Sequence, residues 1–311
     1  MTAYIIRRLL YTIPLVIGVS LIVWAVFDSG VLGDPAAKML GKAATPEKLE
    51  QLHEQLGYNK PAIVRFWDFL WNNLTLNFGR SRNYKIDIVE MILRGMGPSL
   101  SLTLPAFLMA TFIAVSLSLF CASFRGKFID RFLLVTAIAM MSISSLVYVV
   151  IGQYVLAYQA GLFPIAGYQR GAGAMVYVAL PILIFIALTV GPDLRFYRTA
   201  MLEEVKQDYV RTAKAKGVSP NVVLFKHVLR NAMIPVLTRV VVVLPFLFTG
   251  ALLLEMYFNI PGLGGMIVDG VLRDDMPVIR AITFISAILY IVANLLTDIL
   301  YTIVDPRVRL S

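Results

Sequence analysis

The sequence contains one cysteine, Cys121, and two histidines, His53 and His227, among its 311 residues. A single thiol excludes an internal disulfide, a thiolate metal cluster and a redox pair within one chain. We therefore interpret Cys121 as a small buried side chain at the end of an apolar run. With so few of these residues, the chain has little to offer the usual redox and zinc chemistries.

Charged residues are also scarce. Only 15% of the chain is charged, 59% is hydrophobic and the mean hydropathy is +0.77, which is too apolar for an ordinary soluble protein of this length. A membrane-crossing helix needs about 20 mostly apolar residues. We therefore predict an all-α membrane protein with six transmembrane helices. They cover Leu9–Phe27, Leu100–Ala122, Phe132–Ala157, Ala174–Val190, Ile234–Leu254 and Ile279–Val304.

The first apolar run follows Arg7 and Arg8 and could be mistaken for a secretory signal. It is longer than the apolar core of a signal peptide, which is about 7 to 15 residues, and no small-residue cleavage site follows it. We therefore predict that this run is an uncleaved anchor.

The positions of the basic residues predict the topology. If six spans alternate in direction, one side receives Arg7, Arg8, Arg125, Lys127, Arg131, the long polar stretch before the fifth run, Arg307 and Arg309. By the positive-inside rule that side is the cytoplasm, so we expect a multi-pass membrane protein with both termini inside. This arrangement explains the net charge of +9 without nucleic acid. It also separates the two histidines, which excludes a histidine-based metal or nucleophile site.

The segment between the first two runs is predicted to form a small helical region outside the membrane. Thr45 can cap a helix that begins at Pro46 and stops at Gly57, and a second helix follows Pro61. The second helix carries an apolar stripe that consists of Ile63, Phe66, Trp67, Leu70, Trp71 and Leu74. The stripe either packs on the outer ends of the spanning helices, with its tryptophans in the aromatic belt, or docks an external binding protein.

Two features inside the spans have alternative interpretations. Ala106, Ala110 and Ala114 recur at every fourth position, so they either let another helix approach closely or line a pathway. Asp298, with Asn294 one turn before it, is the clearest ionisable group within a span. It has either a structural role, with a partner such as Arg239, or a role in proton transfer.

Nucleotide-binding and hydrolytic motifs are missing from the sequence. The run from Asn259 to Gly265 predicts a tight turn, but a dinucleotide fingerprint would need a glycine at Ile267. Gly41 and Lys42 are followed by Ala43 and lack the upstream glycine of a phosphate-binding loop. We therefore predict no catalytic, cofactor-binding or metal-binding residue, and no ATP hydrolysis by the chain itself.

The polar stretch at residues 193–233, which we call the central segment, lies between two apolar runs. Arg195 to Lys216 is rich in helix formers and lacks proline and glycine, so we expect one helix that ends at Gly217. Ser219 and Pro220 predict the start of a second helix. Tyr209, Ala213 and Lys216 would share one face and offer a small surface to a groove in another protein. The alternative is a solvated loop that merely follows the positive-inside rule.

Several short motifs match those of one family in their order and spacing, and they extend over essentially the whole chain. They are Tyr4-Ile5-Ile6-Arg7-Arg8-Leu9-Leu10 with Ile13-Pro14, Gly33-Asp34-Pro35, Leu56-Gly57 with Lys60-Pro61, Phe78-Gly79-Arg80-Ser81, Leu102-Thr103-Leu104, Asp208 to Gly217, Arg230-Asn231-Ala232, Ile234-Pro235-Val236, Ile260-Pro261-Gly262-Leu263-Gly264 and Asp305-Pro306-Arg307. The chain is similar to the membrane subunit of an ATP-binding-cassette (ABC) importer, the B-type permease of the dipeptide, oligopeptide and nickel family. Importers of this kind generally carry Glu-Ala-Ala where this chain has Arg211, Thr212 and Ala213. This departure is usual in the peptide branch of the family. The glycine that ends the pattern is retained as Gly217.

The resemblance implies the type I ABC importer transmembrane fold and a permease for peptides or a related small solute. It also implies a heterodimer with a C-type permease, two cytoplasmic ATPase subunits and an external substrate-binding protein. The residues implied to couple the chain to the ATPases are Glu203, Glu204, Asp208, Tyr209, Val210, Arg211, Thr212, Ala213, Lys214, Ala215, Lys216 and Gly217.

The expected domains are an anchor with the external helical segment at 1–95, a transmembrane domain at 96–305 that contains the central segment, and a cytoplasmic tail at 306–311. An alternative function is a secondary carrier or channel driven by an ion gradient, which would show intramembrane carboxylates or broken helices near the midplane. Adjacent ATPase genes would favour the importer. An intramembrane hydrolase would need a nucleophile and a base within reach, and the sequence suggests no such pair.

Overall fold

The computed structural model describes residues 2–28, 34–40, 45–55 and 57–304. Gly33, the Gly41-Lys42 pair, Leu56 and the predicted tail at 306–311, with Asp305, Arg307 and Arg309, lie outside these ranges. Within them the regular structure is helical, apart from an isolated antiparallel bridge between Arg80 and Asp87. The described chain forms two compact units, Met1–Gly95 with Met266–Leu295, and Met96–Gly265 with residues 296–304.

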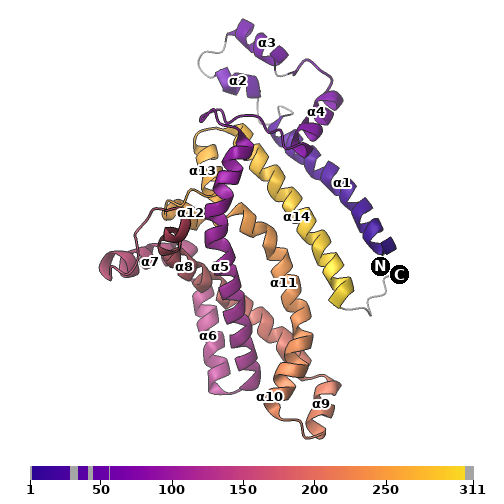
Figure 1. Ribbon diagram of the computed structural model, residues 1–311, viewed down its shortest axis with the longest axis vertical. Helices are drawn as coiled ribbons and strands as arrows, with labels where there is room; N and C mark the ends of the chain where they lie inside the picture. The colour runs from indigo at the N-terminus through magenta and orange to yellow at the C-terminus, as the bar shows by residue number, and fades with distance from the viewer. Residues whose placement is uncertain (1, 29–33, 41–44, 56, 305–311) are drawn as a thin grey trace. The chain divides into compact units, whose positions relative to one another are not determined.

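The first unit contains the helices of the first 95 residues together with parts of the C-terminal ones (Figure 1). Its elements are α1 (Thr2–Phe27), α2 (Pro35–Leu40), α3 (Pro46–Gln55), α4 (Ala62–Leu74), the first turns of α5 (Ile88–Ser123), most of α13 (Leu263–Leu272) and most of α14 (Met276–Val304). The predicted starts of α3 at Pro46 and of α4 after Pro61 are confirmed. Gly57 adopts φ +71° just after α3, as the predicted stop requires.

Buried carboxylates hold the first unit together. Asp275 is 2% exposed and accepts hydrogen bonds from the Ser81 hydroxyl at 2.6 Å and from the backbone amides of Arg82 and Asn83 at 3.1 and 3.2 Å. Asp28, at the end of α1, forms an ion pair with Arg280 of α14 at 2.8 Å. These contacts tie the chain after α4 and the end of α1 to the beginning of α14.

The second unit contains the remaining spanning helices and the central segment (Figure 1). Its elements are the rest of α5, α6 (Phe128–Ser142), α7 (Ser145–Gly152), η2 (Gln153–Gln159), η3 (Gly171–Gly173), α8 (Ala174–Val205), α9 (Asp208–Ala215), α10 (Pro220–Val222), η4 (Val223–Leu229), α11 (Arg230–Thr249) and α12 (Leu252–Tyr257). Ala106, Ala110 and Ala114 of α5 are at most 1% exposed, which favours the helix-packing alternative over the lining of a pathway. Cys121 is also fully buried, as expected.

Five helices of the described chain are long and apolar enough to cross a membrane, or up to six if one bent pair counts as a single span. That pair replaces the straight span predicted at Phe132–Ala157, because α6 and the helix from Ser145 to Gln159 meet at 92°. The bend lies at Ile143 and Ser144, which are extended although neither is proline or glycine. The Met140 carbonyl near the end of α6 accepts hydrogen bonds from the Tyr148 hydroxyl at 3.0 Å and from the Ile143 amide at 3.4 Å, which connects the two arms of the bend.

The predicted span Ile234–Leu254 is also wrong at its end. The helix stops at Thr249, since Gly250 adopts φ +79°, and α12 begins after the break. Conversely, α8 is much longer than the predicted span Ala174–Val190 and continues without interruption to Val205.

Candidate functional site

The central segment begins as a continuation of α8. We expected one helix from Arg195 to Lys216, but α8 ends at Val205 and α9 begins at Asp208. Gln207 is extended, with ψ 151°, and its carbonyl accepts hydrogen bonds from the amides of Val210 and Arg211. The sequence has no helix breaker at this point. Tertiary packing of α9 therefore outweighs the local helix propensity.

The end of α9 follows the prediction. Gly217 adopts φ +77°, and the amides of Gly217 and Val218 donate to the carbonyls of Lys214 and Ala213 at 2.9 and 3.2 Å. The next helix begins at Pro220, also as predicted, although the Ser219 side chain makes no capping hydrogen bond. The central segment is thus a helical hairpin with its tight turn at residues 217–219.

One face of α9 is buried in an apolar cluster that also contains residues of three long helices. Val210 and Ala213 are 1% and 7% exposed and belong to an apolar cluster, which we call the hairpin cluster. Its other buried members are Leu119 and Ala122 of α5, Met201 of α8, Val223 and Val228 of η4, and Ala232 of α11. Our expectation that Ala213 shares an accessible face with Tyr209 is wrong, because Ala213 packs inside its own chain.

The opposite face of α9 is exposed and polar. Its exposed residues are Asp208, Arg211, Thr212, Lys214 and Ala215, with Lys216 following at the helix end. Tyr209 is 36% exposed and its hydroxyl donates to Glu204 in the last turn of α8, close to the exposed Glu203. Burial and this hydrogen bond raise the pKa of Tyr209 to about 12, so the phenol remains a neutral donor at ordinary pH.

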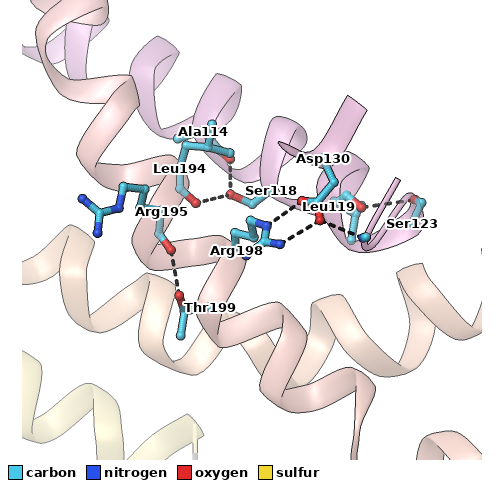
Figure 2. A network of polar contacts seen from close by, with 10 residues as sticks. Ala114, Ser118, Leu119, Ser123, Asp130, Leu194, Arg195, Arg198 and Thr199 are labelled. Carbon is cyan, nitrogen blue, oxygen red and sulfur yellow. Dashed lines mark hydrogen bonds and ion pairs between the residues drawn. The ribbon is translucent and has the colours of Figure 1, made fainter. Parts of the chain in front are cut away.

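A buried ion pair supports the same end of the unit (Figure 2). Arg198 of α8 donates from Nε and from a terminal nitrogen to the two Asp130 oxygens at 2.7 and 2.8 Å, and the Gly126 amide donates to Asp130 at 2.9 Å. Asp130 is 2% exposed. The Ser118 hydroxyl of α5 lies 3.1 Å from the Leu194 carbonyl of α8. These contacts join α5, α6 and α8 just before the hairpin.

Sequence reasoning missed this pair. Asp130 stands in the first turn of α6, a position that favours an acid, but nothing in the sequence links it to Arg198. Arg239, which we considered as a partner for Asp298, forms an ion pair with Asp193 of α8 at 3.3 Å. No group of three or more His, Cys, Asp or Glu residues suited to a metal ion occurs in the described ranges.

A second polar centre lies at the other end of α11. Glu255 of α12 is 1% exposed, and its carboxylate accepts hydrogen bonds from the Ser99 hydroxyl at 2.7 Å, from the Ala251 amide at 3.2 Å and from the Gly265 amide at 3.0 Å. Burial raises the pKa of this carboxyl, while the hydrogen bonds oppose that shift. The predicted tight turn after Asn259 is therefore folded around a buried acid, which sequence reasoning did not assign.

We expect Gly262→Ala to damage this turn and Gly265→Ala to be tolerated. A Cβ at Gly262 would lie 2.4 Å from a Glu255 oxygen and 2.5 Å from the Ser99 hydroxyl, whereas a Cβ at Gly265 meets only the Ile260 carbonyl at 3.5 Å. Overpacking of this kind costs about 1 to 3 kcal/mol of stability. Thermal unfolding of both purified variants in detergent checks the difference, and equal midpoints would contradict it.

Comparisons with known proteins agree with this architecture. The family described as binding-protein-dependent transport system inner membrane component matches residues 114–310, and the N-terminal family of the same membrane components matches residues 1–90. The chain is 33% identical over 313 residues to a probable peptide ABC transporter permease of Sinorhizobium fredii, which covers 99% of this chain and all of the relative. It is 34% identical over 316 residues to the oligopeptide transport system permease AppB of Bacillus subtilis, and the alignment covers 99% of this chain and all of the relative. It is 33% identical over 309 residues to the glutathione transport system permease GsiC of Escherichia coli, with 99% coverage of each.

Proposed function

The chain belongs to the family of binding-protein-dependent transport system inner membrane components and is an ABC importer permease, and we propose that it forms half of an ATP-driven pathway for peptides or a related small solute. The observation that carries the proposal is the attachment of α9. Its apolar face is packed into the hairpin cluster, and its polar face is left exposed.

This arrangement suits a mechanical link. A partner that grips the exposed face of α9 also moves the ends of α5, α8 and α11, because the hairpin cluster joins α9 to all three. Close-packed interiors transmit such displacements as rigid-body shifts. We propose that two cytoplasmic ATPase subunits are the source of the motion. Residues Glu203, Glu204 and Asp208 to Gly217 then form the coupling region, in which Val210 and Ala213 anchor α9 and the exposed residues contact the ATPase.

The remaining partners are proposed from the family. A C-type permease supplies the other half of the pathway, and an external binding protein delivers the solute. Two of the relatives are named for peptide or oligopeptide transport and one for glutathione, so a short peptide is the favoured substrate class. We place residues 1–95 as the anchor with its external segment, residues 96–305 as the transport domain and residues 306–311 as the tail. The hairpin and both termini face the cytoplasm.

Site-directed cross-linking tests the coupling region. Cys121 is buried, so a cysteine introduced at the exposed Thr212 of α9 provides one accessible thiol. A photoreactive maleimide on Thr212→Cys is expected to form an adduct with an ATPase subunit in the assembled transporter. The same label on Asn72→Cys, an exposed position of α4 in the first unit, is expected to form none. Absence of the Thr212→Cys adduct, or equal adducts at both positions, would overturn the assignment.

A further inference from the structure

The apolar stripe of α4 is divided between two faces of the helix. Ile63, Trp67, Trp71 and Leu74 follow one another at intervals of four, four and three residues, so they project to one side. Their exposed fractions are 69%, 55%, 69% and 53%. We call these four side chains the α4 stripe. Of the two alternatives for the apolar stripe, packing on the spanning helices does not apply to these four side chains, because within the described chain they are largely uncovered.

The other face of α4 fixes the helix to the end of α1. Phe66 contacts Trp24 edge to face, with ring centroids 5.9 Å apart, and Phe69 and Leu70 are buried. The Arg65 guanidinium donates to the Asp28 carbonyl and lies 5.9 Å from the centre of the Trp24 ring. These contacts place α4 beside the last turn of α1 within one compact unit (Figure 1).

The end of α1 marks the level at which the chain leaves the apolar layer. Residues Ile6–Phe27 form a candidate span with mean hydropathy 2.3, and only 11% of its most apolar window is buried by the protein. Leu21, Ile22 and Val26 near its end are exposed at 48%, 64% and 38%. The contacts of α4 therefore hold its uncovered stripe next to a helix whose apolar surface is itself available to lipid.

We propose that α4 is an interfacial helix whose stripe lies in the lipid leaflet at the Phe27 end of α1. The chemistry of the stripe fits this partner. Two indoles and two aliphatic side chains combine apolar bodies with N–H groups that can reach the headgroups, and tryptophan is enriched at this depth. The exposed side chains away from the stripe include Asp68 and Asn72, so polar groups remain in water. The stripe contains no charged side chain, whereas charged residues usually fix the orientation of a soluble protein partner.

Tryptophan fluorescence in brominated lipid tests the proposal. The chain has three tryptophans, so replacing two of them with phenylalanine leaves Trp67 or Trp71 as the single reporter. The full chain, assembled with its partner subunits, is reconstituted in phosphatidylcholine vesicles brominated either close to the headgroup or deep in the acyl chains. The emission of the same complex with all three tryptophans of this chain replaced is subtracted. A reporter at Leu74→Trp, with all three natural tryptophans replaced, repeats the test if one of the first two variants folds poorly.

The matched control is Asn72→Trp in the same background, since Asn72 is exposed on the polar side of the same helix. We expect the shallow bromines to quench the stripe reporters about two-fold more strongly than they quench the control. The deep bromines should quench the stripe reporters less than the shallow bromines do, because an interfacial helix enters the membrane by only about 5 to 10 Å. Quenching equal to that of Asn72→Trp would overturn the proposal. If neither brominated lipid quenches the stripe reporters in the complete transporter, the proposal is also overturned, and the stripe is instead covered by a protein partner.

Discussion

Asp130→Ala is expected to reduce the stability of the chain by about 3 to 5 kcal/mol, because it leaves the Arg198 guanidinium buried without its partner. The Arg198 side chain is 17% exposed and directs two hydrogen bonds at the lost carboxylate, and the Gly126 amide loses its acceptor as well. Thermal unfolding in detergent measures the loss. The same variant should also lower the rate of transport, since the ion pair that joins α6 to α8 near the hairpin is lost.

The control for this experiment is an ion pair on the exposed face of α9. Asp208 and Arg211 are 3.4 Å apart, but their side chains are 94% and 76% exposed. Asp208→Ala should leave the unfolding midpoint unchanged, because exposed pairs contribute little. The double variant with Asp130→Ala and Arg198→Ala should recover part of the stability lost in the single variant, since no buried charge remains. A double variant that is less stable than Asp130→Ala would contradict this account.

Ala215→Glu is expected to reduce co-purification of the ATPase subunits, and substrate-stimulated ATP hydrolysis in liposomes, by at least about tenfold. Ala215 is exposed on α9, so the chain itself can accommodate the larger side chain. In an assembled interface the new carboxylate would be desolvated without a partner, which costs several kcal/mol, and about 1.4 kcal/mol already gives a factor of ten. Ala215→Ser keeps the size and adds no charge, and it should retain assembly and activity.

Ala213→Glu separates docking from folding. The change is chemically the same as at Ala215, but Ala213 is 7% exposed within the hairpin cluster. The buried charge should detach α9, so this variant should show a lower unfolding midpoint before any partner is added. Ala215→Glu should instead unfold like the unmodified chain. If both variants lose assembly while neither loses stability, Ala213 faces the partner and our description of α9 is incorrect.

Much of this architecture could be predicted from local sequence. Runs of apolar residues located the spans, and proline or glycine at defined positions located the turns at Gly57, Gly217 and Pro220. The alanines at every fourth position of α5 indicated a packing face as one of two alternatives, and their burial agrees with it. Each of these signals acts over a few residues, so it can be recognised in one segment alone.

The features that sequence reasoning missed depend on residues far apart in the chain. The bend at Ile143 and the break at Gln207 contain no proline or glycine, so no local sequence signal marks them. The buried site of Glu255 could not be recognised from the sequence, since its donors at Ser99 and Gly265 come from other elements. Ala213 was assigned to the wrong face because helical spacing shows which residues lie together, but not which side a neighbouring cluster will cover.

The uninterrupted path of α8 has a mechanical consequence. Its 32 residues make a rod about 48 Å long at about 1.5 Å per residue, whereas the hydrocarbon layer is about 30 Å thick. The excess lies beyond the bilayer at the Val205 end, where Met201 joins the hairpin cluster. If α8 tilts as one body by a few degrees about its other end, the Val205 end moves sideways by about 2 to 4 Å, in proportion to its distance from the pivot. A small rotation inside the membrane is then felt most strongly at the surface.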